Sequence, residues 1–138
     1  MKTPQRTDGA DAHGRMVRSL RRVVERSDFD ELAAILDPGV VLLIDGGGQV
    51  VVARESIRGI VAVSAQLLAV LGTSTGLSLS ERSVNGQIGL LVRRGHLIVG
   101  VLTVNILDDR ITDIWVVVNP DKLRSYNREP RPRGSVYR

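Results

Sequence analysis

The sequence contains no cysteine among its 138 residues, which excludes disulfides, thiolate zinc sites and cysteine nucleophiles. Aromatic side chains are also scarce, and the few present cannot build a base-stacking platform: Phe29, Trp115, Tyr126 and Tyr137. The longest apolar runs, such as residues 114–118, are far too short to span a bilayer. Residues 1–10 are polar and lack the apolar segment of a secretory signal. We therefore expect a cytoplasmic protein.

Positive charge is concentrated at the two ends of the chain, although the formal net charge is only +4. Residues 1–26 hold seven Lys or Arg against three acids, and residues 120–138 hold six against two, so the middle carries a net −4. A folded body of this charge predicts no direct, sequence-specific DNA binding. Near the N-terminus, one helical face is basic and is either solvated or a docking face for an acidic surface. It carries Arg18, Arg21, Arg22 and Arg26.

Hydrophobic periodicity predicts three helices. The first begins near residue 13 and has an apolar stripe of Met16, Leu20, Val23 and Val24. The second follows Asp28, an N-cap with Glu31 at the reciprocal capping-box position, and ends at residues 37–39. The third spans residues 60–71, is apolar nearly all round and is therefore expected to be deeply buried. Gly72 is expected to cap it.

The remaining segments are rich in β-forming residues. Residues 40–44 and 50–53 flank a glycine-rich turn and predict a hairpin. An antiparallel meander follows over residues 77–84, 87–93, 97–107 and 111–118, with Asn85-Gly86 as its strongest turn signal. The order α-α-β-β-α-β-β-β-β predicts an α+β domain in which helices pack on a curved antiparallel sheet. The domain is expected over residues 13–124, between a disordered leader (1–12) and a disordered Pro/Arg-rich tail (125–138).

The last two strands are apolar on both faces, and this pattern predicts that both faces are covered. The helices can cover one face, and a second subunit is the natural cover for the other. We therefore predict a homodimer through the sheet.

Four segments resemble SnoaL-like proteins of the nuclear-transport-factor-2-like superfamily, and most closely the C-terminal SnoaL-like extension of SigJ-type extracytoplasmic-function sigma factors. They are Ser27-Asp28-Phe29-Asp30-Glu31-Leu32 with Leu36-Asp37-Pro38, Asp45-Gly46-Gly47-Gly48, Val84-Asn85-Gly86-Gln87, and residues 114–123, which end in Asn119-Pro120-Asp121-Lys122-Leu123. The resemblance implies a cone-shaped fold. Upstream of the similar span, this sequence has only a short segment in place of the promoter-binding and polymerase-binding regions of such sigma factors. It therefore implies a regulatory domain alone, with sigma regions or RNA polymerase as partners.

In a cone fold, the concave face of the final strand lines a cavity. On that basis we expect a pocket for a small apolar ligand, oriented by Asp113 and Asn119, with apolar walls from Leu67, Leu71, Val101, Trp115 and Val117. Trp115, the sole tryptophan, is expected to be both pocket wall and core residue. The alternative is a cyclase- or isomerase-like enzyme with Asp113 as general base, since burial would raise the pKa of that carboxyl group.

The other candidate residues favour binding over catalysis. No tyrosine lies in a predicted strand to stabilise an oxyanion, and the two histidines, His13 and His96, are far apart in sequence. We expect no metal and no cofactor. The glycine turn lacks the Lys-Ser/Thr of a phosphate-binding loop and is interpreted as a hairpin turn. The resemblance implies partner contacts at two segments: Asp45, Gly46, Gly47 and Gly48, and Asn119, Pro120, Asp121, Lys122 and Leu123.

Overall fold

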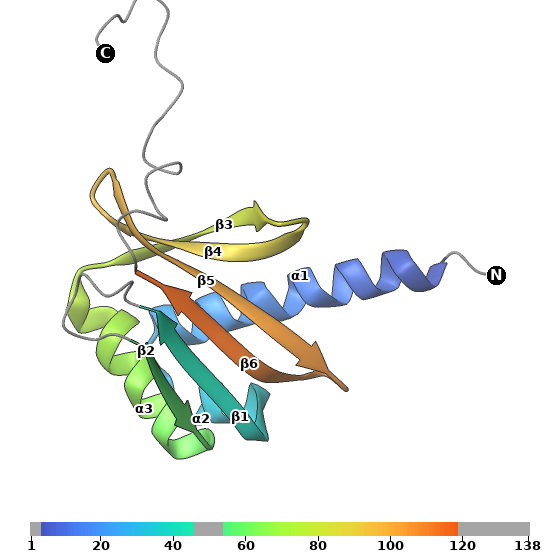
Figure 1. Cartoon of the computed structure of the whole chain (residues 1–138), viewed down its shortest axis with the longest axis horizontal. Coiled ribbons are helices and arrows are strands. Elements are labelled where there is room, and N and C mark those ends of the chain that lie inside the picture. The colour runs from blue at the N-terminus through green and yellow to red at the C-terminus, as the bar shows by residue number, and fades with distance from the viewer. Residues whose placement is uncertain (1–3, 46–53, 119–138) are drawn as a thin grey trace, which may run out of the picture.

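The computed structural model describes residues 4–45 and 54–118, which form three helices packed on one six-stranded sheet (Figure 1). The helices are α1 (Pro4–Glu25), α2 (Phe29–Ile35) and α3 (Ile60–Leu71), with a short 3-10 turn, η1 (Thr73–Thr75). The strands are β1 (Leu36–Asp45), β2 (Arg54–Arg58), β3 (Ser78–Val84), β4 (Gln87–Arg94), β5 (Leu97–Leu107) and β6 (Arg110–Val117). The fold is α+β, as predicted. Within these residues, no helix is long and apolar enough to cross a membrane.

The strand order is β2-β1-β6-β5-β4-β3. Strands β3 to β6 form the predicted antiparallel meander, but β1 pairs with β6 in parallel, so the sheet is mixed and not wholly antiparallel. The parallel pair places the N-terminal strand in the interior of the sheet, next to the last strand of the meander. Its register shifts between Leu36 and Val41, where Pro38 interrupts the ladder.

Two predicted boundaries differ from the structure. Helix α1 begins at Pro4, so residues 4–12 are helical where the sequence predicted a leader. Proline suits the first helical position because its missing N–H would be unpaired there, and this first part of α1 carries no apolar stripe that periodicity could detect. Strand β1 begins at Leu36, directly after α2, because Asp37-Pro38-Gly39 continues as a strand after ending the helix.

The connection from α1 to α2 is held by local hydrogen bonds. Ser27 has a φ of 52°, and the amides of Ser27 and Asp28 donate to the carbonyls of Val24 and Val23, which caps the end of α1. The Asp28 carboxylate accepts from the Glu31 amide at 3.0 Å, which confirms the predicted N-cap of α2. The Asp28 amide is already bonded to Val23, so the reciprocal half of a capping box is not formed.

The main core lies between the helices and one face of the sheet. Helix α1 contributes Val17, Leu20, Val23 and Val24, and the sheet contributes alternate residues of each strand, such as Leu42, Leu102 and Ile114. Helix α3 matches its predicted bounds but is only half buried. Val63, Leu67 and Leu71 face the core, whereas Val61 is 70% exposed. The interior is therefore aliphatic and is built from one stripe of each helix.

Candidate functional site

The face of the sheet opposite the helices is not covered by any described helix or strand, and Figure 1 views the molecule from this side. Along β6, Ile114 and Val116 are buried in the main core. Asp113, Trp115 and Val117 alternate with them and therefore lie on the uncovered face. Trp115 is 49% exposed, the largest apolar side chain there. The sole tryptophan is thus outside the core.

Strand register identifies the neighbours of Trp115. It pairs with Leu43 of β1 on one side and Thr103 of β5 on the other, and Leu43 in turn pairs with Ser56 of β2. The adjacent row runs Arg58, Val41, Asp113 and Asn105 across β2, β1, β6 and β5. Cross-strand partners share a face, so these side chains form one continuous surface. We call Val41, Leu43, Asp113, Trp115 and Val117 the open-face patch.

A second, separate apolar cluster adjoins the patch on the same face. It consists of Val84, Leu91, Ile98 and Val101, all buried, and Val101 pairs with Val117 of the patch. In contrast, Val41, Leu43 and Val117 are only partly buried. The apolar surface that solvent reaches is therefore centred on β1 and β6.

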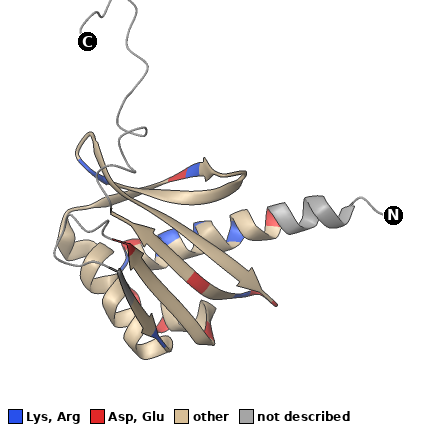
Figure 2. Ribbon diagram, in the orientation of Figure 1, with Lys and Arg blue, Asp and Glu red and all other residues tan. Residues whose placement is uncertain are grey.

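Charged groups surround the open-face patch and do not fill it. Figure 2 shows that most of the ribbon on this face is uncharged. Arg58 is exposed beside Val41, and Asp113 accepts a hydrogen bond of 2.9 Å from the Thr112 hydroxyl group. Neither Arg58 nor Asp113 forms an ion pair with any residue in the described part of the chain. An apolar centre with charges at its margin is the usual anatomy of a protein interface.

The structure does not bring the predicted pocket residues together. Leu67 and Leu71 of α3 lie in the main core, whereas Asp113, Trp115 and Val117 lie on the other side of the sheet. The remaining predicted wall, Val101, belongs to the second cluster, and Asn119 lies outside the described residues. The prediction failed because β6 is apolar on both faces, so its alternation could not show which face the helices cover.

Asp113 does not occupy the environment that a general base of this kind requires. It lies partly exposed on the uncovered face, where no apolar cavity can raise the pKa of its carboxyl group. On the helix-covered side, Ser64 is the buried polar side chain among the described residues, and its hydroxyl group has no hydrogen-bond partner there. A hydroxyl group without a neighbouring base is not an activated nucleophile.

The predicted partner-contact segments are only partly described. Asp45 ends β1 and is buried at 6% exposure, which corrects the expectation of a solvated turn residue. The Asp45 carbonyl oxygen accepts the amide hydrogen of Val118 at 2.9 Å. Gly46, Gly47, Gly48, Asn119, Pro120, Asp121, Lys122 and Leu123 lie outside the described residues.

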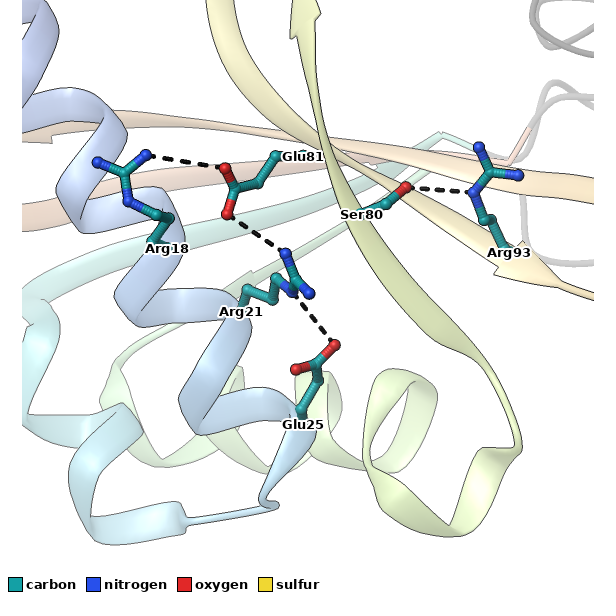
Figure 3. A network of polar contacts seen from close by, with 6 residues as sticks. All are labelled: Arg18, Arg21, Glu25, Ser80, Glu81 and Arg93. Carbon is teal, nitrogen blue, oxygen red and sulfur yellow. Dashed lines mark hydrogen bonds and ion pairs between the residues drawn. The ribbon is translucent and has the colours of Figure 1, made fainter.

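The basic face of α1 is partly neutralised by a strand carboxylate that the sequence did not indicate. Glu81 of β3 lies 3.7 Å from Arg18 and 3.3 Å from Arg21, and Arg21 also bonds Glu25 (Figure 3). These distances join guanidinium nitrogens to carboxylate oxygens. The network fastens α1 to the edge of the sheet. Because it is solvent-accessible, its contribution to stability is modest, about 1 kcal/mol or less per pair.

The two histidines are not part of a shared site. His13 lies on α1, and its Nε2 is within 3.2 Å of the Ile88 carbonyl oxygen of β4, whereas His96 is exposed in the β4–β5 turn. The described residues contain no group of three or more metal-ligating side chains.

Comparison with known proteins now places the architecture. The chain superimposes on the Mycobacterium tuberculosis extracytoplasmic function sigma factor SigJ with a TM-score of 0.63 and 22% identity, over 81% of this chain and 44% of that one. It has a SnoaL-like, nuclear-transport-factor-2-like fold. A similar structure is an NTF2-like protein from Mesorhizobium loti, with a TM-score of 0.59 and 15% identity over 80% of this chain and 93% of that one.

Enzymes occur among the similar structures as well. An LEH-like epoxide hydrolase from M. tuberculosis gives a TM-score of 0.51 and 16% identity, over 85% of this chain and 90% of that one. No protein-family model matches the chain, and no curated protein does so. This SnoaL-like fold therefore hosts both catalytic and non-catalytic proteins, and the function must be argued from the residues on its surface.

Proposed function

We propose that this SnoaL-like chain is a non-catalytic regulatory domain that acts through protein contacts made by its open-face patch. The observation that supports the proposal is the position of Trp115, 49% exposed between Leu43 and Thr103 on a face that no helix covers. An exposed tryptophan at the centre of an apolar patch is the side chain most often found at the energetic centre of a protein interface.

The partners we propose are a second copy of the chain, bound sheet to sheet, and the sigma regions or RNA polymerase of a transcription complex. The likeness to SigJ supports the second partner, since this chain corresponds to less than half of that sigma factor. A SnoaL-like domain that contacts sigma regions would modulate transcription initiation, a role that belongs in the cytoplasm. The similarity covers the fold alone, so the contacts themselves must be tested.

Catalysis and apolar-ligand binding are not part of the proposal. The predicted ligand pocket is divided by the sheet, and the residue that would serve as general base, Asp113, lies on the uncovered face. The fold keeps its helix-covered side for packing and leaves its one tryptophan on the opposite side.

The sole tryptophan makes the proposal directly measurable. As protein concentration rises, we expect Trp115 emission to shift to shorter wavelength and acrylamide quenching to decrease, because the indole becomes buried. Sedimentation velocity should show Trp115→Ala to be less associated than the wild type. Val61→Ala, which removes exposed apolar surface from α3 instead, is the matched control and should leave association unchanged.

A second experiment addresses the transcription partner. Purified sigma-factor helical regions and RNA polymerase are titrated separately into the labelled domain, and binding is followed by anisotropy and by acrylamide quenching of the indole. Protection of Trp115 by either partner, lost in Trp115→Ala anisotropy titrations, supports the proposal. If the indole remains equally quenchable at every concentration and with every partner, the open-face patch is not the contact surface.

A further inference from the structure

The charges beside the open-face patch are arranged symmetrically about β1. Val41 pairs with Arg58 of β2 on one side and with Asp113 of β6 on the other, so the three residues lie at one level across the sheet. Neighbouring strands are about 4.8 Å apart, which places the cation and the anion at equal distances on either side of Val41. Both are without an ion-pair partner among the described residues.

This arrangement is complementary to itself. A two-fold axis that lies in the interface and runs along β1 exchanges the positions of β2 and β6 between two facing sheets. Arg58 of each copy then faces Asp113 of the other copy, and two identical ion pairs form. We propose that the chain dimerises about this axis, an inference that rests on the proposed use of the open-face patch for protein contact.

The same axis accounts for the apolar residues of the patch. In the next row, Leu43 is flanked by Ser56 and Trp115, so the axis places each indole over the small Ser56 of the second copy and beside its Leu43. Val41 and Leu43 meet their own counterparts at the centre. Facing sheets pack about 10 Å apart, a separation that an arginine and an aspartate side chain can span together. The interface is therefore isologous, with aliphatic residues at its centre and ion pairs at its margin.

Charge reversal tests the axis. In Arg58→Asp, both cross-copy pairs become Asp–Asp, and in Asp113→Arg both become Arg–Arg, so each variant alone should dimerise at least about tenfold more weakly than wild type. An equimolar mixture behaves differently. One Arg58→Asp chain and one Asp113→Arg chain place an Asp–Arg pair at one position and an Asp–Arg pair of opposite polarity at the other. The mixture should therefore form a heterodimer.

Sedimentation velocity on the two variants, separately and mixed, measures this outcome, with circular dichroism as a check of folding. Arg22→Asp, which changes the same charge on the exposed side of α1, is the matched control and should dimerise like wild type. Loss in both single variants and recovery in the mixture support the axis. Wild-type dimerisation by either single variant, or a mixture that stays monomeric, overturns it.

The outcomes also separate this inference from the proposed function. If wild type dimerises with Trp115 protected while the mixture fails, the patch is the interface but the axis is wrong. A wild-type chain that remains monomeric at all concentrations overturns the second copy as the occupant, and protection of Trp115 by a sigma region would then identify another protein there. If Trp115 is never protected, the proposed function itself fails.

Discussion

Two adjacent residues of β6, Ile114 and Trp115, should respond to truncation in the reverse order of their size. Ile114 is 1% exposed and belongs to the main core, whereas Trp115 is 49% exposed on the uncovered face. Replacing Ile114 by alanine removes buried surface and leaves a cavity under the helices, which costs about 2–5 kcal/mol of unfolding free energy. The larger side chain should matter less to the monomer, because it is only half removed from water.

The magnitude for Trp115 follows from its exposure. Full burial of a large apolar side chain contributes up to about 3 kcal/mol, so a half-exposed one contributes about 1.5 kcal/mol. Its removal opens space to solvent and leaves no closed cavity, so no cavity penalty is added. We therefore expect Trp115→Ala to reduce the unfolding free energy of the monomer by about 1–2 kcal/mol, less than Ile114→Ala.

The assay is urea unfolding followed by far-ultraviolet circular dichroism, because one variant lacks the fluorophore. Measurements at two protein concentrations separate folding from association. At low concentration, the monomer values apply, and at high concentration, wild type and Ile114→Ala should gain stability that Trp115→Ala does not. A loss for Trp115→Ala at low concentration that equals or exceeds the loss for Ile114→Ala would refute the assignment of faces.

Four further changes test individual features of the fold by the same unfolding assay. Gly72→Ala should cost about 1–3 kcal/mol, because its Cβ would lie 2.5 Å from a backbone oxygen, whereas in Gly14→Ala the nearest atoms are 3.7 Å away in a flexible side chain and the helix should gain about 0.5–1 kcal/mol. Ser64→Ala should stabilise the chain by about 1 kcal/mol, since it removes a buried hydroxyl group without a hydrogen-bond partner in the described structure; a loss would reveal a partner. Asp109→Gly should also stabilise by about 1 kcal/mol, because this turn residue has a φ of 63°; an unchanged midpoint would contradict that origin of strain. Glu81→Gln should cost about 1 kcal/mol or less at low salt and almost nothing at high salt; a loss independent of salt would mean that packing, and not charge, is responsible.

Local chemistry was sufficient to predict most of the secondary structure. The bounds of α3 and β5 match the periodicity of their sequences, and Asn85-Gly86 forms the expected tight turn, with φ values of 51° and 85°. Asp28 caps α2 because its carboxylate needs only an amide three residues away. These features depend on neighbours in the chain, so the order of residues already contains the information.

The candidate surface depended on long-range pairing. The sequence indicated correctly that β6 is apolar on both faces, and that Trp115 shares one of them with Asp113 and Val117. It could not show which face the helices cover, because alternation has period two and both faces are hydrophobic. Only the tertiary structure assigns Ile114 to the core and Trp115 to the surface.

The same limit applies to the proposed dimer contacts. Arg58 and Asp113 are far apart in sequence, and nothing local relates them. They flank Val41 because β1, after pairing with β2, also pairs in parallel with β6, the last strand of the meander. The sequence by itself determined the elements and their apolar faces, whereas only the packing of strands decided which side chains remain in solvent and which charges lie beside them.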